Sequence, residues 1–292
     1  MVVIVWGVNF AILKFALGQF EVLAFTFLRF AGMVALAWAV VFWRERGRLH
    51  IERQDWLRLG AAGLLGYTGY IQLSIVGLNF TTAFSNAILI AAAPLFAALM
   101  LWAWRVEPVG RARAIGFGVS FLGVTVFLAD KLHGGQLIAG LGDGISLLAA
   151  VFYAAYQVVL KPLLARYPAT VVTAYTLAIG SVPVFLVCLP SLLHQDWARV
   201  NPTGWTVLVW STVAPVYVAW TLWSWATARA GVGATNAFIF LVPVASGLTS
   251  FVLLGEAFDA VKLAGAALVL TGLALARLKP RRASVKAAER AA

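Results

Sequence analysis

Apolar residues run through this chain in long stretches that short polar breaks separate. Each stretch approaches the roughly 20 residues that an α-helix needs to cross the hydrocarbon core of a bilayer. Glycine and proline mark many of the breaks, as at Gly18, Gly47 and Pro168. The pattern predicts ten membrane-spanning helices, near residues 2–17, 22–43, 59–77, 81–104, 112–129, 142–161, 170–190, 204–226, 233–253 and 260–277.

Composition indicates that the solvent of this chain is lipid. Hydrophobic residues make up 62% of it, charged residues 11%, and the mean hydropathy is +0.92. Soluble domains carry about 25% charged and about 45–50% apolar residues, so a soluble core would not hide this much apolar surface. The net charge of +11 does not indicate a nucleic-acid partner, because most basic residues fall in the short breaks. We therefore expect an all-α integral membrane protein.

The distribution of lysine and arginine predicts the orientation of the spans. If both termini are cytoplasmic, 17 of the 22 basic residues lie in inside loops or the C-terminal tail, and only three lie in outside loops. Such an excess is typical of cytoplasmic loops. We expect a multi-pass protein of the cell inner (plasma) membrane with both termini cytoplasmic. The basic tail, residues 279–292, is predicted to be disordered and to suit an anionic inner leaflet.

The ends of the two halves carry the same four residue types, 13, 9 and 7 residues apart. In the first half they are Pro94, Glu107, Gly116 and Gly123, and in the second half, shifted by 149, they are Pro243, Glu256, Gly265 and Gly272. Because an odd number of predicted spans separates the copies, they would cross the membrane in opposite directions. We predict two inverted five-helix repeats, over residues 1–130 and 140–278.

The starts of the two halves match as well. The Trp-Gly-Val-Asn motif at 6–9 precedes Lys14, and the Tyr-Ala-Ala-Tyr motif at 153–156 precedes Lys161, with eight residues from the first aromatic residue to the lysine in both. Further marks are Arg29 in the second span, Gly142-Asp143 at the sixth, and Pro243 followed by Gly255-Glu256 at the ninth. Together these features resemble the ten-helix EamA-type branch of the drug/metabolite transporter superfamily. The first half departs from the pattern, since Val106 rather than glycine precedes Glu107.

The resemblance implies a secondary transporter that exports amino acids and related small metabolites by alternating access through a central cavity. Within the superfamily, the chain is similar to the YddG-like exporters of aromatic amino acids. A lipid or lipid-linked-sugar flippase or membrane enzyme is the alternative, and a receptor or scaffold is a further one. Proton coupling, exchange and uniport all stay open, and the sequence favours a monomer without excluding a dimer.

Motifs for enzyme chemistry are absent from the sequence. It contains no phosphate-binding loop, nucleophile elbow or metal-ligand cluster, and Cys188 is its single cysteine. We therefore expect no enzyme activity, no cofactor and no metal site.

Polar and aromatic residues follow helical spacing along one face of several predicted spans. Because a polar side chain that faces lipid is unfavourable, these faces should point inward. We expect them to line a cavity where hydroxyls and amides bind polar groups of the substrate and aromatic rings stack on its apolar part or cover an ammonium group. The alternative is hydrogen bonding between helices. The candidates are Asn9, Tyr70, Ser74, Ser85, Asn86, Tyr153, Tyr156, Gln157, Tyr217, Trp220, Ser224 and Asn236.

Two prolines, Pro94 and Pro243, lie inside the fourth and ninth predicted spans. A proline inside a helix removes one hydrogen bond and displaces the carbonyl group four residues earlier, here that of Ile90 or Ile239. The sequence predicts kinks that either flex during alternating access or only shape the packing.

Charged residues within or beside the spans have several possible roles. Lys14 is expected to extend to the lipid headgroups. Alternatively, Lys14 and Arg29 could hold a substrate carboxylate or pair with helix carbonyl groups, and the family resemblance implies a conformational or structural role. Asp143, Glu107 and Glu256 are expected to cap the helices that they precede.

Glycines recur at helical spacing, which allows helices to approach closely in a membrane. They recur every three residues at Gly60, Gly63, Gly66 and Gly69, and every seven at Gly116 and Gly123 and at Gly265 and Gly272. We expect internal packing, with a dimer contact as the alternative.

Overall fold

The computed structural model describes residues 1–45, 50–104, 111–133, 137–219, 222, 238 and 241–277. Side chains are described for these residues except 111–113, 129–133, 137–139, 216, 217 and 277. Every regular element in this part of the chain is helical, and it contains no strand, which confirms the predicted all-α class.

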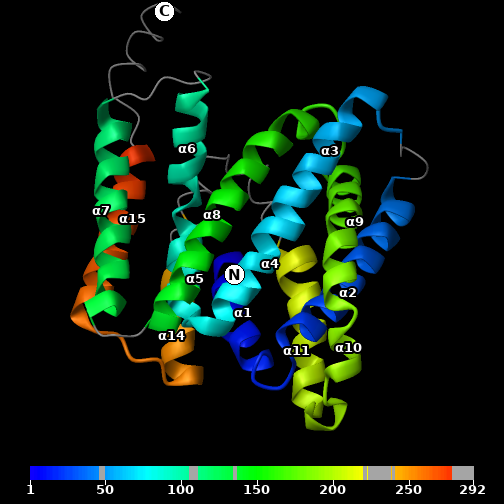
Figure 1. Cartoon of the computed structure of the whole chain (residues 1–292). Coiled ribbons are helices and arrows are strands. Elements are labelled where there is room, and N and C mark those ends of the chain that lie inside the picture. Colours follow the sequence, from blue (N-terminus) through cyan, green and yellow to red (C-terminus); the bar gives the residue numbers. More distant parts are fainter. Residues whose placement is uncertain are drawn as a thin grey trace, which may run out of the picture.

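The helices follow one another in the order that Figure 1 colours from blue to red. They are α1 (Val2–Ala16), α2 (Val22–Arg44), η1 (Arg53–Asp55), α3 (Trp56–Gly63), η2 (Leu64–Ile71), α4 (Gln72–Phe80), α5 (Ala83–Ala91), α6 (Ala93–Ala103), α7 (Arg111–His133), α8 (Leu137–Leu164), α9 (Ala169–Cys188), α10 (Ser191–His194), η3 (Trp197–Arg199), α11 (Pro202–Val213), η4 (Ala214–Val218), α14 (Leu241–Leu254) and α15 (Ala260–Arg277).

The described helices coincide with at least part of every predicted span. Among the described residues, five helical stretches are long and apolar enough to cross a membrane, and four further apolar helices are shorter. The arrangement is compatible with ten spans.

Two of the predicted spans are not single regular α-helices. The third runs as α3, η2 and α4, of which η2 is π-helical. The fourth is divided at Ala92 into α5 and α6. Pro94 lies in the first turn of α6, where its missing N–H leaves no hydrogen bond unmade. The break two residues before Pro94 lies where the sequence predicts a kink in the fourth span, and Pro243 is similarly placed as the third residue of α14.

The two π-helical segments occupy corresponding positions in the two halves. The shift of 149 maps residues 65–69, inside η2, onto residues 214–218, which form η4. In η4, the carbonyl oxygen of Pro215 accepts a hydrogen bond of 3.0 Å from the indole Nε1 of Trp6 on α1. Because π-helical turns are rare and occur often at functional sites, this pair distinguishes the third helix of each half.

The most extensive helix pairings join the first half to the second: α7 with α15, α1 with α14, α4 with α8, and α2 with α9. The pairings are also similar when each helix is replaced by its counterpart in the other half, 149 residues away. The pair α1–α14 corresponds to α8 against α5 and α6, and the pair α2–α11 corresponds to α9 against α3. This pattern is compatible with two repeats related by a two-fold axis.

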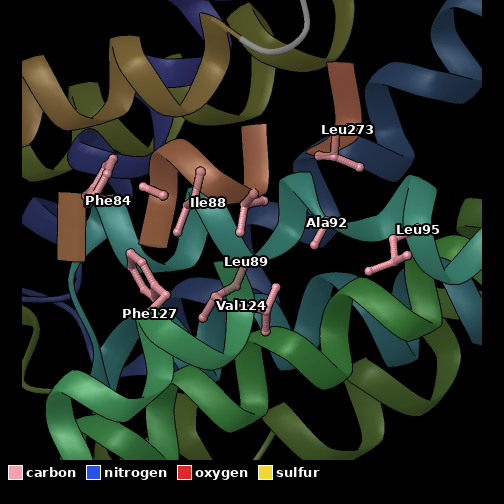
Figure 2. Packing of buried hydrophobic residues seen from close by; sticks show 10 residues of the cluster. Phe84, Ile88, Leu89, Ala92, Leu95, Val124, Phe127 and Leu273 are labelled. Atoms are coloured by element: carbon pink, nitrogen blue, oxygen red, sulfur yellow. The ribbon is translucent and has the colours of Figure 1, made fainter. Parts of the chain in front are cut away.

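An apolar cluster fills the space between α5, α6, α7 and α15. Figure 2 shows Phe84, Ile88 and Leu89 of α5 beside Val124 and Phe127 of α7, all of them buried. The cluster packs α5 against the pair formed by α7 and α15.

The glycines at seven-residue spacing pack on each other between α7 and α15. A Cβ atom added to Gly116 would lie 2.6 Å from the carbonyl oxygen of Gly272, and one added to Gly123 would lie 2.9 Å from that of Gly265. These contacts confirm internal packing. Of the four glycines spaced by three in the third span, Gly60 alone has open space around it.

Candidate functional site

Four tyrosines from two helices form an aromatic cluster, which we call the tyrosine cluster. Tyr67 and Tyr70 extend from η2, and Tyr153 and Tyr156 extend from α8. The ring centroids are 4.4 Å apart for Tyr70 and Tyr153, 6.0 Å for Tyr67 and Tyr156, and 6.3 Å for Tyr153 and Tyr156. Such separations are typical of favourable aromatic contacts. Since η2 and α8 come from different halves, the cluster lies at their junction.

Glycines in the third span allow η2 to approach α8 this closely. A Cβ atom added to Gly66 would lie 2.5 Å from the ring of Tyr156, and one added to Gly69 would lie 2.1 Å from the ring of Phe152. Of the four tyrosines, Tyr67 is buried and the other three are half-buried. The rings are therefore held by the backbone while part of their surface stays accessible.

Arg29 brings a positive charge to the tyrosine cluster. Its side chain extends from α2, is 6% exposed, and interacts electrostatically with Tyr70. The guanidinium Nε lies 3.4 Å from the carbonyl oxygen of Ser211 on α11. A guanidinium has five N–H donors, and this long bond uses one of them. A charged group inside a membrane protein normally faces a partner or a wet cavity.

Asn9 adds a second buried polar group, on α1. Its side chain is 9% exposed, and the amide oxygen has no hydrogen-bond partner in the described part of the chain. Buried polar atoms are nearly always hydrogen-bonded, to protein or to ordered water. This oxygen is therefore suited to a water molecule or a polar group of a ligand.

Three other predicted cavity residues, Ser74, Ser85 and Asn86, take part in bonds within and between helices. The amide nitrogen of Asn86 donates to the carbonyl oxygen of Ser74 at 2.8 Å and to the hydroxyl of Ser146 at 3.0 Å. The hydroxyl of Ser85 accepts from that of Thr82 at 2.8 Å. These bonds link α4, α5 and α8 in the way that the helix-bonding alternative expects.

The remaining candidates do not join the cluster in the described part of the chain. Gln157 is exposed, although it lies one turn after Tyr153 on α8. Tyr217 lies in η4, but its side chain is not among those described. The other three candidates fall outside the described residues, and they are Trp220, Ser224 and Asn236.

Sequence reasoning missed Tyr67. The signal was present, because Tyr67 and Tyr70 are three residues apart, as are Tyr153 and Tyr156. Two spans with the same tyrosine spacing can present two rings each to one another. In the third span, the prediction included only residues on the same helical face as Tyr70, and Tyr67 lies on a neighbouring face.

Lys14 binds protein rather than extending to the lipid headgroups. Its ammonium group donates to the carbonyl oxygens of Leu78 at 2.7 Å and Asn79 at 3.0 Å, at the end of α4. The last carbonyl groups of a helix lack partners within it and carry partial negative charge, so a cation is favourable there. This is the helix-carbonyl alternative that the sequence left open.

Glu256 caps a different helix from the one that the sequence predicts. Its carboxylate accepts from the backbone N–H groups of Ala83 at 2.7 Å and Phe84 at 3.4 Å, at the start of α5. Gly255 has a φ of 63°, a conformation that glycine adopts easily, and it turns the chain directly before Glu256. The expectation that Glu256 caps the following span was therefore wrong.

Asp143 does not cap its own helix either. It lies inside α8, which begins at Leu137, and its carboxylate accepts a hydrogen bond from the hydroxyl of Thr81. The reason is that α8 begins earlier than the predicted span. Glu107, the remaining predicted cap, falls outside the described residues.

Among the described residues, no group of histidine, cysteine, aspartate or glutamate is placed to hold a metal ion.

The overall fold is similar to that of a protein of known crystal structure. The TM-score is 0.64, the sequence identity is 22%, and the match covers 96% of each chain. This similarity shows the fold alone.

Several proteins of similar length are similar in sequence. An uncharacterized transporter of Archaeoglobus fulgidus is 25% identical, over 96% of each chain. A probable terminal-alkyne amino-acid exporter of Streptantibioticus cattleyicolor is 28% identical, over 94% of this chain and 90% of that protein. A probable amino-acid metabolite efflux pump of Salmonella typhimurium is 26% identical, over 94% and 91%.

The profile of the EamA-like transporter family matches residues 1–129 and again residues 140–278. Because the two matches together cover most of the chain, this membrane protein belongs to the EamA-like transporter family.

Proposed function

We propose that this transporter exports amino acids, including aromatic ones, and that the tyrosine cluster with Arg29 is part of its substrate site. The observation that carries the proposal is a buried guanidinium that interacts electrostatically with Tyr70, one of the four clustered tyrosines at the junction of the two halves. The relatives named as an amino-acid exporter and as an amino-acid metabolite efflux pump support this substrate class. The proposal includes similarity to the YddG-like group and, with it, a preference for aromatic side chains.

The chemistry of the cluster suits a zwitterion. The unused N–H donors of Arg29 can bind a carboxylate, which guanidinium groups hold in a two-pronged geometry. The faces of the tyrosine rings attract an ammonium group and stack on an aromatic side chain. The amide oxygen of Asn9, which has no partner in the described part of the chain, is a further acceptor that we assign to the lining of the substrate path. In the second half, Tyr217, Trp220, Ser224 and Asn236 complete the proposed lining.

For the transport cycle, we propose alternating access between two inverted five-helix repeats, residues 1–130 and 140–278. The exchange symmetry of the helix pairings and the corresponding positions of η2 and η4 support this arrangement. Both termini are placed in the cytoplasm and the protein in the inner membrane, with the basic tail 279–292 at the inner leaflet, on the strength of the charge distribution.

The test of substrate class uses purified protein in liposomes. We expect counterflow of labelled phenylalanine or a similar amino acid, and Arg29→Gln should weaken apparent affinity about tenfold or more, because a charge-assisted hydrogen bond is lost. The same variant should affect phenethylamine, which lacks the carboxylate, much less. Equal effects on acid and amine would refute the assigned role of Arg29.

A matched pair of tyrosine variants tests the cluster. Tyr153→Ala should weaken apparent affinity by roughly three- to tenfold through lost ring contacts. Tyr175→Ala is the control, since Tyr175 also makes ring contacts, with Trp38 and Trp56, but lies outside the cluster. Lipid scrambling by the wild-type protein without flux of any amino acid would instead favour a flippase.

A further inference from the structure

The turn that joins α4 to α5 is held by charged side chains from four other segments. Lys14 comes from α1, Asp143 from α8, Glu256 from the segment after α14, and Lys262 from α15. All of them bind residues 78–84. We call these four side chains the turn clamp.

Two of the clamp residues, Lys14 and Glu256, are opposite in charge to the helix ends that they bind. The cation Lys14 binds the last carbonyl groups of α4, and the anion Glu256 binds the first N–H groups of α5. Each of these helix ends has backbone groups without partners inside its own helix and carries the opposite partial charge. The clamp therefore stabilises both ends of the turn at once.

The other two members bind the threonines of the turn. Asp143 accepts from the hydroxyl of Thr81, and Lys262 donates to the hydroxyl of Thr82 at 3.3 Å. Of the four clamp residues, only Lys14 belongs to the first half, as the turn does. The clamp is consequently a contact between the two halves.

The packing around the clamp joins the same two halves. The hydroxyl of Ser246 on α14 lies 3.3 Å from the carbonyl oxygen of Ala83, and a Cβ atom added to Gly247 would lie 2.9 Å from the ring of Phe84. In Figure 1 the end of α14 and the start of α5 lie at the same lower end of the bundle as α10. The charge distribution assigns this end to the outside.

We propose that Glu256 is a latch that closes the substrate path at the outer end and opens it by leaving α5. The Glu256 side chain is half-buried, and its carboxylate accepts hydrogen bonds from backbone N–H groups of α5. Glu256 belongs to a short non-helical segment, and Gly255 turns this segment away from α14. Near the membrane surface both partners can exchange this contact for water, so release has a small net cost. The role of the latch in transport rests on the proposed alternating access.

Accessibility of a single cysteine tests the latch without any substrate. In a Cys188→Ala background, Ser85→Cys places a reporter that is buried in the first turn of α5, close to the latch. With a membrane-impermeant thiol reagent added outside, Glu256→Gln should raise the labelling rate about tenfold, because the charged contact is weakened by about that factor. Labelling from the inside should not change.

The matched control is Glu21→Gln. Glu21 is a carboxylate at the same end, and it accepts from Ser191 rather than from the turn. Its replacement should leave Ser85→Cys labelling unchanged. An unchanged labelling rate in Glu256→Gln would refute the latch. So would an increase that is equal from both sides of the membrane, or one no larger than that in Glu21→Gln.

A second experiment crosslinks α5 to α14 beside the latch, so that the outer end stays closed. Ala83→Cys and Ser246→Cys place thiols on two residues that are in contact, through the Ser246 hydroxyl and the Ala83 carbonyl oxygen at 3.3 Å, where a short bifunctional thiol reagent can join them. Flux should stop in the joined protein and return when a cleavable linker is cut. Undiminished flux in fully joined protein would overturn the proposal. If no amino acid is carried by any form, the labelling result still decides the latch, and the substrate assignment alone fails.

Discussion

The α7–α15 pair and the α4–α5 turn both join the two halves, but by opposite means. Between α7 and α15 the backbones touch, and a Cβ atom added to Gly272 would lie 2.3 Å from the amide nitrogen of Ser120. At the turn, charged side chains reach across and bind the ends of α4 and α5. One contact depends on close packing and the other on hydrogen bonds.

This difference determines which contact can be remade during a transport cycle. Close backbone packing weakens steeply as helices separate, because a gap of about 0.5–1 Å already removes about a quarter to a half of the dispersion attraction and water or lipid has to fill the space. Hydrogen bonds at the membrane surface can instead be replaced by bonds to water at small net cost. We therefore expect the α7–α15 pair to stay joined throughout the cycle and the turn clamp to open and close.

The largest effect should come from filling the packed pair. Gly272→Leu would place a side chain against the backbone of α7, which cannot move aside, and should destabilise the protein by about 3 kcal/mol. Thermal unfolding in detergent measures this. Gly118→Leu is the control, because Gly118 lies on α7 with open space around it. Similar melting temperatures for the two variants would contradict the assignment of this pair as a fixed contact.

An intermediate effect is expected at Asn86, about one turn into α5 from the clamp. Its side chain is fully buried and bonds α5 to α4 and α8, so Asn86→Ala should lower stability by about 1–2 kcal/mol. Apparent substrate affinity should stay unchanged, since Asn86 lies outside the tyrosine cluster. Thr249→Ala, which removes a bond within α14 only, is the control. A specific loss of affinity in Asn86→Ala would return this residue to the substrate site.

The smallest effect should come from the opposite end of the bundle. There Arg166 donates to Glu52 and Asp55, both at 2.6 Å, and both Arg166 and Glu52 are exposed. The pKa of Glu52 is lowered, first by a hydrogen bond from Gln54 and then by one from Arg166. Because water competes for exposed ion pairs, Arg166→Gln should lower the melting temperature only slightly at neutral pH.

The pH dependence of that effect has a definite sign. A carboxyl group whose pKa is lowered by folding stabilises the protein above its ordinary pKa of 4.5, and this contribution is lost as the pH falls through the lowered value. The melting temperatures of wild type and Arg166→Gln should therefore converge towards about pH 3. A difference that persisted there would mean that Arg166 acts through a contact other than the one with Glu52, such as that with Asp55.

Helix positions followed from the sequence because apolar length and punctuation depend on local residues. The break at Ala92 lies where Pro94 predicts a kink, but the π-helical turns did not follow from the sequence, since backbone geometry there responds to neighbouring helices. Tyr70, Tyr153 and Tyr156 were recognised from their types, but hydrophobic spacing could not distinguish them from Ser85 and Asn86, which bond between helices. Only the neighbours of a polar side chain decide between the two roles.

The sequence by itself determined a helical membrane protein, the resemblance to its family and the glycines that bring α7 and α15 together. Those features depend only on residue type and on spacing along the sequence. The tertiary structure decided that Glu256 caps α5 and that Lys14 binds the end of α4. Both contacts join residues that are far apart in sequence, and electrostatic matching of helix ends acts only once folding has placed those ends beside the charges.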